Sequence, residues 1–180
     1  MADKSRIESE WKNIILTGYR AVGKTSVGKV LARQLRMDFI DTDQEIVRRE
    51  GREIKDIVAR EGWGYFRERE GELLVELAAG EGMVIATGGG AITHENWPRL
   101  MASGLVVWLT ADEETICRRL TADTNTADQR PSLTNNTVFQ EVSEVLAARR
   151  PLYQQGSHIR VDTAQSDIQS IVDEIISSLP

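Results

Sequence analysis

This chain of 180 residues lacks several features that would fix its location or fold class. Its only cysteine is Cys117, so no disulfide can form within the chain, and a reducing cytoplasm suits it. The two histidines, His94 and His158, are far apart in sequence, which argues against a histidine-rich metal site. No apolar run approaches the ~20 residues of a membrane-spanning helix, and residues 1–11 lack the apolar segment of a secretory signal. We therefore expect a cytoplasmic protein with no membrane partner.

A surplus of positive charge is also missing. The chain has 28 acidic and 22 basic residues, which gives a net charge of −6. Nucleic-acid binding normally needs a clustered basic surface, so we do not expect a nucleic-acid partner, whereas a small anionic ligand needs only a few well-placed arginines. The length suits one domain with a full hydrophobic core, and no repeat or linker divides it. We expect a single domain over residues 1–180 that acts as a monomer.

Residues 18–25, GYRAVGKT, match the phosphate-binding P-loop pattern G-x-x-x-x-G-K-[ST]. An apolar run, residues 14–16, precedes the motif and an amphipathic stretch, residues 26–35, follows it, as the strand–loop–helix context requires. In such a loop, backbone N–H groups at the helix N-terminus surround the phosphates, Lys24 reaches the β- and γ-phosphates, and the Thr25 hydroxyl can ligate Mg²⁺. The chain is therefore predicted to bind a nucleoside triphosphate. The predicted nucleotide-binding residues here are Gly18, Tyr19, Arg20, Ala21, Val22, Gly23, Lys24, Thr25 and Ser26.

Short apolar runs alternate with amphipathic segments along the whole chain. This alternation predicts a parallel sheet covered by helices on both faces, a three-layer α/β fold. The predicted strands are residues 13–17, 39–41, 83–87, 105–109 and 158–161. The predicted helices are residues 26–35, 44–61, 65–79, 94–102, 112–121, 137–154 and 166–178.

Two carboxylates, Asp41 and Asp43, follow the second predicted strand. Ligands of open parallel sheets bind beyond the carboxyl ends of the strands, which places both acids near the P-loop. One could hold Mg²⁺ through water, and the other could accept a hydrogen bond or proton from a substrate hydroxyl. The alternative is that Asp43 is only the N-cap of a helix that begins at Gln44.

Four further segments carry groups that suit anionic ligands. In FRERE, residues 66–70, Glu70 can hold the Arg67 guanidinium, although a solvated helix face explains the same pattern. Gly88, Gly89 and Gly90 directly follow a predicted strand, which suggests close approach of a ligand to bare backbone or a plain turn. Arg149 lies near the end of a predicted helix, where arginine also favours the helix dipole. The polar stretch 121–136 predicts a mobile lid in which Arg130 reaches a phosphate, or a simple surface loop.

Together the P-loop, FIDTD (39–43), FRERE (66–70), TGGG (87–90), RPSL (130–133) and RRPLY (149–153) resemble the shikimate kinase family over nearly the whole chain. The resemblance implies a P-loop kinase fold like that of nucleoside monophosphate kinases, with a five-stranded parallel sheet and a lid at about residues 121–136. It also implies transfer of the ATP γ-phosphoryl to the 3-hydroxyl of shikimate, a step of the chorismate pathway.

The resemblance assigns roles to residues at the matching positions. Lys24, Asp43 and Arg130 would be catalytic, and Asp41 would hold Mg²⁺ through water beside Thr25. Arg119 would lie near the adenine, and Arg130 would also contact the phosphates. The implied substrate-binding residues are Asp43, Arg67, Gly88, Gly89, Gly90 and Arg149.

Two departures from the family pattern concern nucleotide binding. Ala21 stands where the family usually has glycine, and Ala164-Gln165 stand where it often has an arginine near the adenine. Two alternatives to a shikimate kinase are a gluconate-kinase-like enzyme of the same architecture and a non-catalytic homologue that binds nucleotide or shikimate. The presence of Lys24, Asp43 and Arg130 argues against the second alternative.

Overall fold

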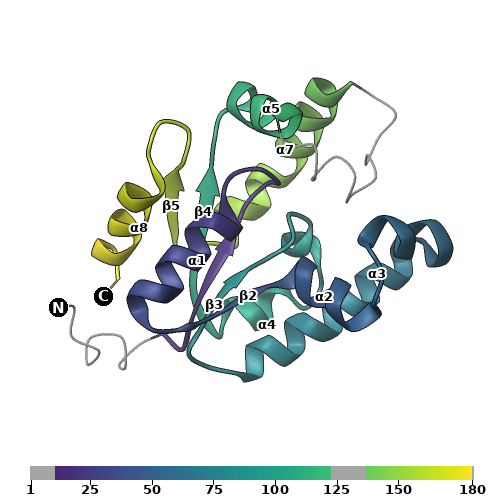
Figure 1. The fold of residues 1–180 in the computed structure, drawn as a ribbon, viewed down its shortest axis with the longest axis horizontal. Helices are drawn as coiled ribbons and strands as arrows, with labels where there is room; N and C mark the ends of the chain where they lie inside the picture. Colours follow the sequence, from purple (N-terminus) through teal and green to yellow (C-terminus); the bar gives the residue numbers. More distant parts are fainter. Residues whose placement is uncertain (1–10, 123–136, 180) are drawn as a thin grey trace.

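The computed structural model describes residues 11–122 and 137–179, and within them five parallel strands form one sheet (Figure 1). The order across the sheet is β2-β3-β1-β4-β5. The strands are β1 (Asn13–Thr17), β2 (Asp38–Asp41), β3 (Met83–Ala86), β4 (Gly104–Thr110) and β5 (Ile159–Asp162). The predicted parallel sheet is confirmed, and each strand begins and ends within one residue of its predicted range.

Helices cover both faces of this sheet (Figure 1). They are α1 (Lys24–Leu35), α2 (Thr42–Glu50), α3 (Ile54–Ala79), α4 (Trp97–Met101), α5 (Glu113–Ala122), α7 (Val138–Gln155) and α8 (Ile168–Ser177), with a 3₁₀ turn, η2 (Ala91–Thr93). None of these described helices combines the length and apolar composition needed to cross a bilayer.

Alternate residues of the strands enter two separate hydrophobic clusters. Ile14 and Leu16 of β1 pack on the face covered by α1, α5, α7 and α8, whereas Ile15 packs on the face covered by α2, α3 and α4. Every residue of β1 and of β4 is buried. Because both faces of these central strands are covered, they read as continuous apolar runs rather than as alternating ones. This two-sided burial makes the central sheet the rigid support for the loops at its carboxyl edge.

The prediction for residues 44–61 was wrong, because the chain turns within that range. Gly51 adopts a left-handed conformation, φ 63°, and ends α2, and α3 then starts at Ile54. The predicted break near residue 62 is confirmed: the helical backbone of α3 is interrupted at Gly62, with φ 82° and ψ 168°, and two helical stretches meet there at a kink. The predicted helix 94–102 is shorter than expected, since only Trp97–Met101 is helical.

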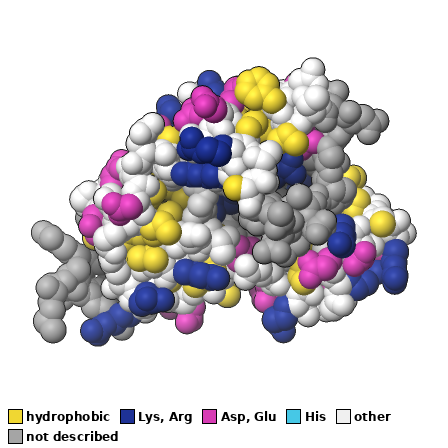
Figure 2. All heavy atoms as spheres, turned by 45° about the horizontal axis from the view of Figure 1, so that its top comes forward, with side chains coloured by type: hydrophobic (Ala, Val, Ile, Leu, Met, Phe, Trp, Pro, Cys, Tyr) yellow, Lys and Arg dark blue, Asp and Glu magenta, His cyan; other side chains and the backbone are white. Residues whose placement is uncertain are grey.

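The order of the strands determines where the functional loops meet. The P-loop follows β1, Asp41 ends β2, and the Gly88–Gly90 segment follows β3. Since β2, β3 and β1 are neighbours and parallel, these three segments lie along one edge of the sheet. The surface drawn in Figure 2 has basic and acidic side chains interspersed, without a broad patch of one sign.

Candidate active site

The P-loop between β1 and α1 has a backbone that only particular residues tolerate. Gly18 has φ 140°, and a Cβ there would collide with the Leu109 carbonyl oxygen. Gly23, with φ 97°, is the N-cap of α1 and provides no side-chain cap. The first N–H groups of α1 are thus not occupied by a capping side chain, which is the arrangement that binds anions. Ala21 is also left-handed, with φ 64°, which explains why glycine suits this position.

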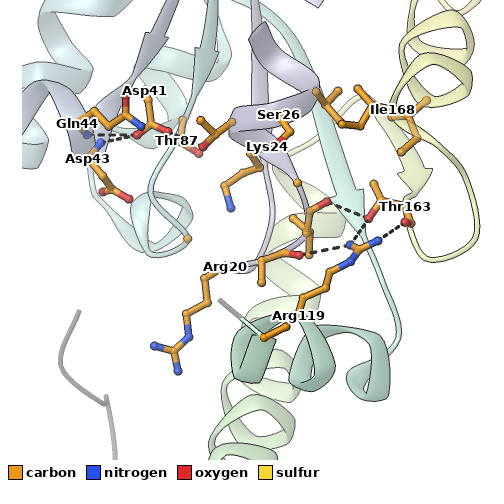
Figure 3. A pocket seen from close by; sticks show the side chains of 18 of the residues that line it. Arg20, Lys24, Ser26, Asp41, Asp43, Gln44, Thr87, Arg119, Thr163 and Ile168 are labelled. Carbon is orange, nitrogen blue, oxygen red and sulfur yellow. Dashed lines mark hydrogen bonds between the residues drawn. The ribbon is translucent and has the colours of Figure 1, made fainter. Parts of the chain in front are cut away.

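Lys24 extends back across the P-loop. Its Nζ donates hydrogen bonds to the carbonyl oxygens of Gly18 and Tyr19, both at 2.8 Å. In Figure 3 its side chain points into the cavity described below. Lys24 therefore lies where it can meet the phosphates of a nucleotide held by the loop. Tyr19 contributes only its backbone to this side, because its ring is buried in the core.

The two acids after β2 have separate positions. Asp41 Oδ2 accepts a hydrogen bond of 2.6 Å from the Thr25 hydroxyl. Asp41 Oδ1 accepts from the backbone N–H groups of Asp43 and Gln44, at 3.1 and 3.2 Å. Asp41, and not Asp43, is thus the N-cap of α2, so the alternative that Asp43 is the cap was wrong. The carboxylate of Asp43 lines the cavity.

A cavity of about 1030 Å³ extends from these carboxylates along the P-loop to the start of α8. Asp41, Asp43 and Thr87 line one end, and Arg119, Thr163 and Ile168 line the other (Figure 3). The volume and the mixture of polar and apolar walls suit a nucleotide together with a small second ligand. Thr163 and Ile168 were not predicted, although their position just after the last predicted strand was a usable signal.

Arg119 joins α5 to the loop that follows β5. Its guanidinium donates to the Ala21 carbonyl at 3.3 Å, to the Thr163 hydroxyl at 3.1 Å and to the Thr163 carbonyl at 2.5 Å. The Thr163 hydroxyl in turn donates to the Val22 carbonyl at 2.9 Å. The plane of the guanidinium is therefore fixed at the end of the cavity remote from Asp43.

Two arginines from distant helices meet at the glycine segment that follows β3. Arg67 of α3 forms an ion pair with Glu70, whose side chain is buried. A Cβ on Gly90 would lie 2.7 Å from Arg67 Nη1 and closer still to Nη2, so glycine makes room for this guanidinium. Arg149 of α7 donates to the Gly89 carbonyl at 3.0 Å. We call Arg67 and Arg149 the two-arginine site.

The glycine segment itself is held by the protein. Gly88 N–H donates to the Thr42 hydroxyl at 2.9 Å, and the buried Tyr153 hydroxyl donates to the Gly89 carbonyl at 2.7 Å. Gly89 also lines the cavity. The backbone here is thus fixed next to the two-arginine site. Sequence reasoning missed the roles of Thr42 and Tyr153, which come from tertiary contacts.

Arg20 differs from the other P-loop residues, because its side chain points away from Lys24 (Figure 3). It forms an ion pair with Glu141 of α7, whose side chain is only 3% exposed. Burial raises the pKa of the neighbouring Tyr19 above its ordinary value, against the opposing charge of Arg20, so that hydroxyl stays protonated at neutral pH. The guanidinium of Arg20 connects the P-loop to α7.

The predicted catalytic residue Arg130 and most of the predicted lid, 121–136, lie outside the described residues. Thr121 and Ala122 are the last two residues of α5. Of the other predicted site residues, the described structure brings the P-loop, the two acids, the glycine segment and the three arginines 67, 119 and 149 to one edge of the sheet.

A comparison with family models matches residues 20–180 to the family described as shikimate kinase. The shikimate kinase of Syntrophus aciditrophicus (strain SB) is 44% identical over 185 residues, which cover 98% of this chain and 95% of that protein. A solved structure of shikimate kinase from Acinetobacter baumannii in complex with shikimate superposes with a TM-score of 0.88. Its sequence is 35% identical, and the match covers 97% of this chain and 96% of that one.

A gluconokinase structure from Sinorhizobium meliloti 1021 is much less similar. It is 22% identical with a TM-score of 0.58, over 93% of this chain and 91% of that one. At this identity the likeness shows a common fold and nothing more. The comparisons therefore do not favour the gluconate-kinase alternative.

Proposed function

Because this chain belongs to the shikimate kinase family, we propose that it transfers the γ-phosphoryl group of ATP to the 3-hydroxyl of shikimate. The products are ADP and shikimate 3-phosphate, a precursor on the chorismate route to aromatic amino acids. The observation that carries the choice of substrate is the two-arginine site next to the P-loop cavity. Two guanidinium groups beside bare glycine backbone suit a small carboxylate.

On the nucleotide side, the N–H groups of the P-loop and Lys24 neutralise the β- and γ-phosphates, and the Arg119 guanidinium packs near the base. The hydroxyl of Thr25 and the carboxylate of Asp41, joined at 2.6 Å, are the hard oxygen groups that suit Mg²⁺ held partly through water. Mg²⁺, when bound with the nucleotide, spreads the charge that develops on the phosphate oxygens.

On the acceptor side, Arg67 and Arg149 bind the carboxylate of shikimate and so fix the orientation of the ring. Asp43 lines the cavity together with the P-loop, where it can accept the proton or a hydrogen bond of the attacking hydroxyl. The hydroxyl oxygen forms the new bond to the γ-phosphorus as the bond to the β–γ bridging oxygen breaks, which releases ADP. Phosphoryl transfer depends mainly on such positioning and on charge neutralisation.

The proposal extends beyond the described residues. We infer that Arg130 contacts the phosphates from a lid at about 121–136, and that residues 1–180 act as one domain and one monomer. The single cysteine supports a cytoplasmic location. ATP and shikimate are the proposed partners.

A coupled assay of ADP release tests the proposal directly. The purified protein is mixed with MgATP and with shikimate, gluconate or no acceptor. We expect ADP release with shikimate and only background rates in the other two mixtures. Turnover of gluconate in preference to shikimate would support the alternative kinase, and nucleotide binding without turnover of either would support the non-catalytic homologue.

The two-arginine site is tested with Arg67→Ala. A charge-assisted hydrogen bond contributes about 1.5–3 kcal/mol, so the KM for shikimate should rise about tenfold to a hundredfold while the KM for ATP changes little. Arg69→Ala is the matched control, because Arg69 lies on the same helix and pairs with the exposed Glu72 at 2.9 Å. An equal rise in the KM for ATP and in the KM for shikimate, or no change in the KM for shikimate, would contradict the assignment of Arg67.

A further inference from the structure

His94, just after η2, contacts α3 at the backbone of a residue of the two-arginine site. Its Nε2 lies 3.1 Å from the carbonyl oxygen of Arg67. Its Nδ1 accepts a hydrogen bond of 3.0 Å from the backbone N–H of Asn96. No sequence motif indicated a role for this residue, and the proposed reaction does not use it.

These two hydrogen bonds define the state of the ring. A nitrogen that accepts from a backbone N–H carries no proton, so the proton of the neutral imidazole must be on Nε2. That Nε2–H then donates to the Arg67 carbonyl. Both ring nitrogens are used by backbone groups, one in the loop after η2 and the other in α3.

Gly71 provides the room for this ring. It is buried within α3, and a Cβ there would lie 2.5 Å from His94 Nε2, with Cε1 still closer. Glycine in a helix interior costs about 1 kcal/mol relative to alanine. The Asn96 side chain adds a weaker contact, 3.4 Å to the Gly71 carbonyl. The contact between His94 and α3 therefore depends on a glycine that the helix alone would not favour.

The contact joins the two segments between which the substrate carboxylate would bind. The Arg67 guanidinium lies against Gly90, and the Arg149 guanidinium donates to the carbonyl of Gly89. Arg67 moves with α3, whereas Gly89 and Gly90 belong to the segment that leads through η2 to His94. The spacing of the two guanidinium groups thus depends on how α3 lies relative to residues 88–96, and His94 links these two parts.

We propose that His94 is a positioning residue for the two-arginine site: it fixes α3 against residues 88–96 and thereby sets the geometry in which the substrate carboxylate binds. The proposal rests on the proposed function, since it assigns the carboxylate to Arg67 and Arg149. Because it concerns the binding of one substrate, it predicts a change in the KM for shikimate and not in the KM for ATP.

The kinetic test compares His94→Ala with His94→Gln. Loss of the contact in His94→Ala should raise the KM for shikimate about fivefold to tenfold, which corresponds to about 1–1.4 kcal/mol, while kcat and the KM for ATP stay within about twofold of wild type. In His94→Gln the side-chain amide can still donate to the Arg67 carbonyl, so most of the wild-type KM should return. A role confined to stability would lower the melting temperature of His94→Ala without this selective change.

Two further variants separate the proposal from general damage. Gly71→Ala should raise the KM for shikimate in the wild-type background and have little effect in the His94→Ala background, where the ring that the new Cβ would meet is gone. His158→Ala is the matched control, because the Nδ1 of His158, just before β5, also accepts from a backbone N–H, that of Val106 on β4 at 2.9 Å. It should change stability and leave the KM for shikimate unchanged.

NMR of the histidine rings gives a reading that does not depend on activity. Long-range ¹H–¹⁵N spectra at pH 8 should show His94 as the Nε2–H tautomer, and His94→Ala should identify its signals, since the chain has two histidines. An Nδ1–H tautomer, or equal changes in the KM of both substrates in His94→Ala, would overturn the proposal. If the wild-type protein does not phosphorylate shikimate at all, the proposed function fails, while the spectra still report whether the contact exists.

Discussion

Asp41 and Asp43 are two residues apart, yet they have different tasks. Asp41 is occupied by Thr25 and by the N-terminal N–H groups of α2, so its charge is already neutralised in part by helix and hydroxyl dipoles. Asp43 belongs to the first turn of α2 and lines the cavity. Sequence reasoning placed both acids correctly at the edge of the sheet. It considered only Asp43 as a cap, because it expected the helix to begin at Gln44, whereas α2 begins at Thr42.

Asp43→Asn separates the chemistry from the fold. Since Asp41 is the cap, this change should cost no more than the loss of one charge near a helix N-terminus, about 0.3–1 kcal/mol. Turnover should fall by about a hundredfold or more, the usual scale for a positioned general base. Thermal unfolding, ATP titration and single-turnover transfer are measured on one preparation. A variant that is stable and transfers phosphate at the wild-type rate would remove Asp43 from the catalytic residues.

Gly90→Ala tests the close approach of Arg67 to the glycine segment. The added Cβ would collide with the guanidinium, so Arg67 must move and the KM for shikimate should rise about tenfold, on the scale of one lost charge-assisted hydrogen bond. Gly64→Ala is the control, since a Cβ at Gly64 meets no atom within 4 Å. An unchanged KM for shikimate in Gly90→Ala would mean that Arg67 does not need this position.

At the scale of elements, α7 is attached to the site at two places. Near its start, the buried Glu141 pairs with Arg20 of the P-loop, and near its end Arg149 and Tyr153 both donate to Gly89. One helix therefore contacts the nucleotide loop and the glycine segment together. The amphipathic pattern of the sequence predicted the helix. It did not predict these pairings, because Glu141 and its partner Arg20 lie 121 positions apart in sequence.

Glu141→Ala should be strongly destabilising, because it leaves the partly buried Arg20 without its partner carboxylate. Loss of one member of a buried ion pair typically costs about 3–5 kcal/mol, and the 18% exposure of the Arg20 side chain places the expectation near the lower end. Urea unfolding measures this value. Glu72→Ala, which breaks the exposed pair with Arg69, should change stability by less than about 1 kcal/mol. Similar values for the two variants would show that the pair with Arg20 is only a surface contact.

For the whole molecule, the sequence predicted the sheet correctly but not the bounds of all the helices. The strands are short apolar runs buried on both faces, so their pattern is unmistakable. The break at Gly51 was missed because an isolated glycine inside an amphipathic pattern can also be tolerated within a helix, whereas the break at Gly62 lies where the sequence predicted one. Both glycines have positive φ, a conformation that interrupts a regular helix.

Acid should weaken a charge cluster on α2, at its contact with α3, in a defined range of pH. Glu45 of α2 accepts hydrogen bonds from Arg48 and Arg49, and Arg49 also reaches both carboxylate oxygens of Glu76 on α3, at 2.7 and 2.8 Å. Hydrogen bonds from Arg48, and then from Arg49, lower the pKa of Glu45 from 4.5 to about 2. A carboxyl group with a lowered pKa in the folded state takes up its proton more readily when the chain is unfolded. Its stabilising effect is therefore complete above pH 4.5 and is lost as the pH falls from 4.5 to about 2.

Glu45→Gln removes this titration and so gives the test. At pH 7 the variant should melt about 1–3 °C below wild type, since partly exposed pairs contribute about 0.2–1 kcal/mol. The difference should shrink as the pH falls from 4.5 toward 2, because wild-type Glu45 then becomes neutral as well, and high salt should reduce it at pH 7. Melting curves of wild type, Glu45→Gln and the control Glu114→Gln, an exposed acid on α5, are compared at each pH. A difference that persists unchanged to pH 2 would mean that Glu45 stabilises the helices by packing and not by its charge.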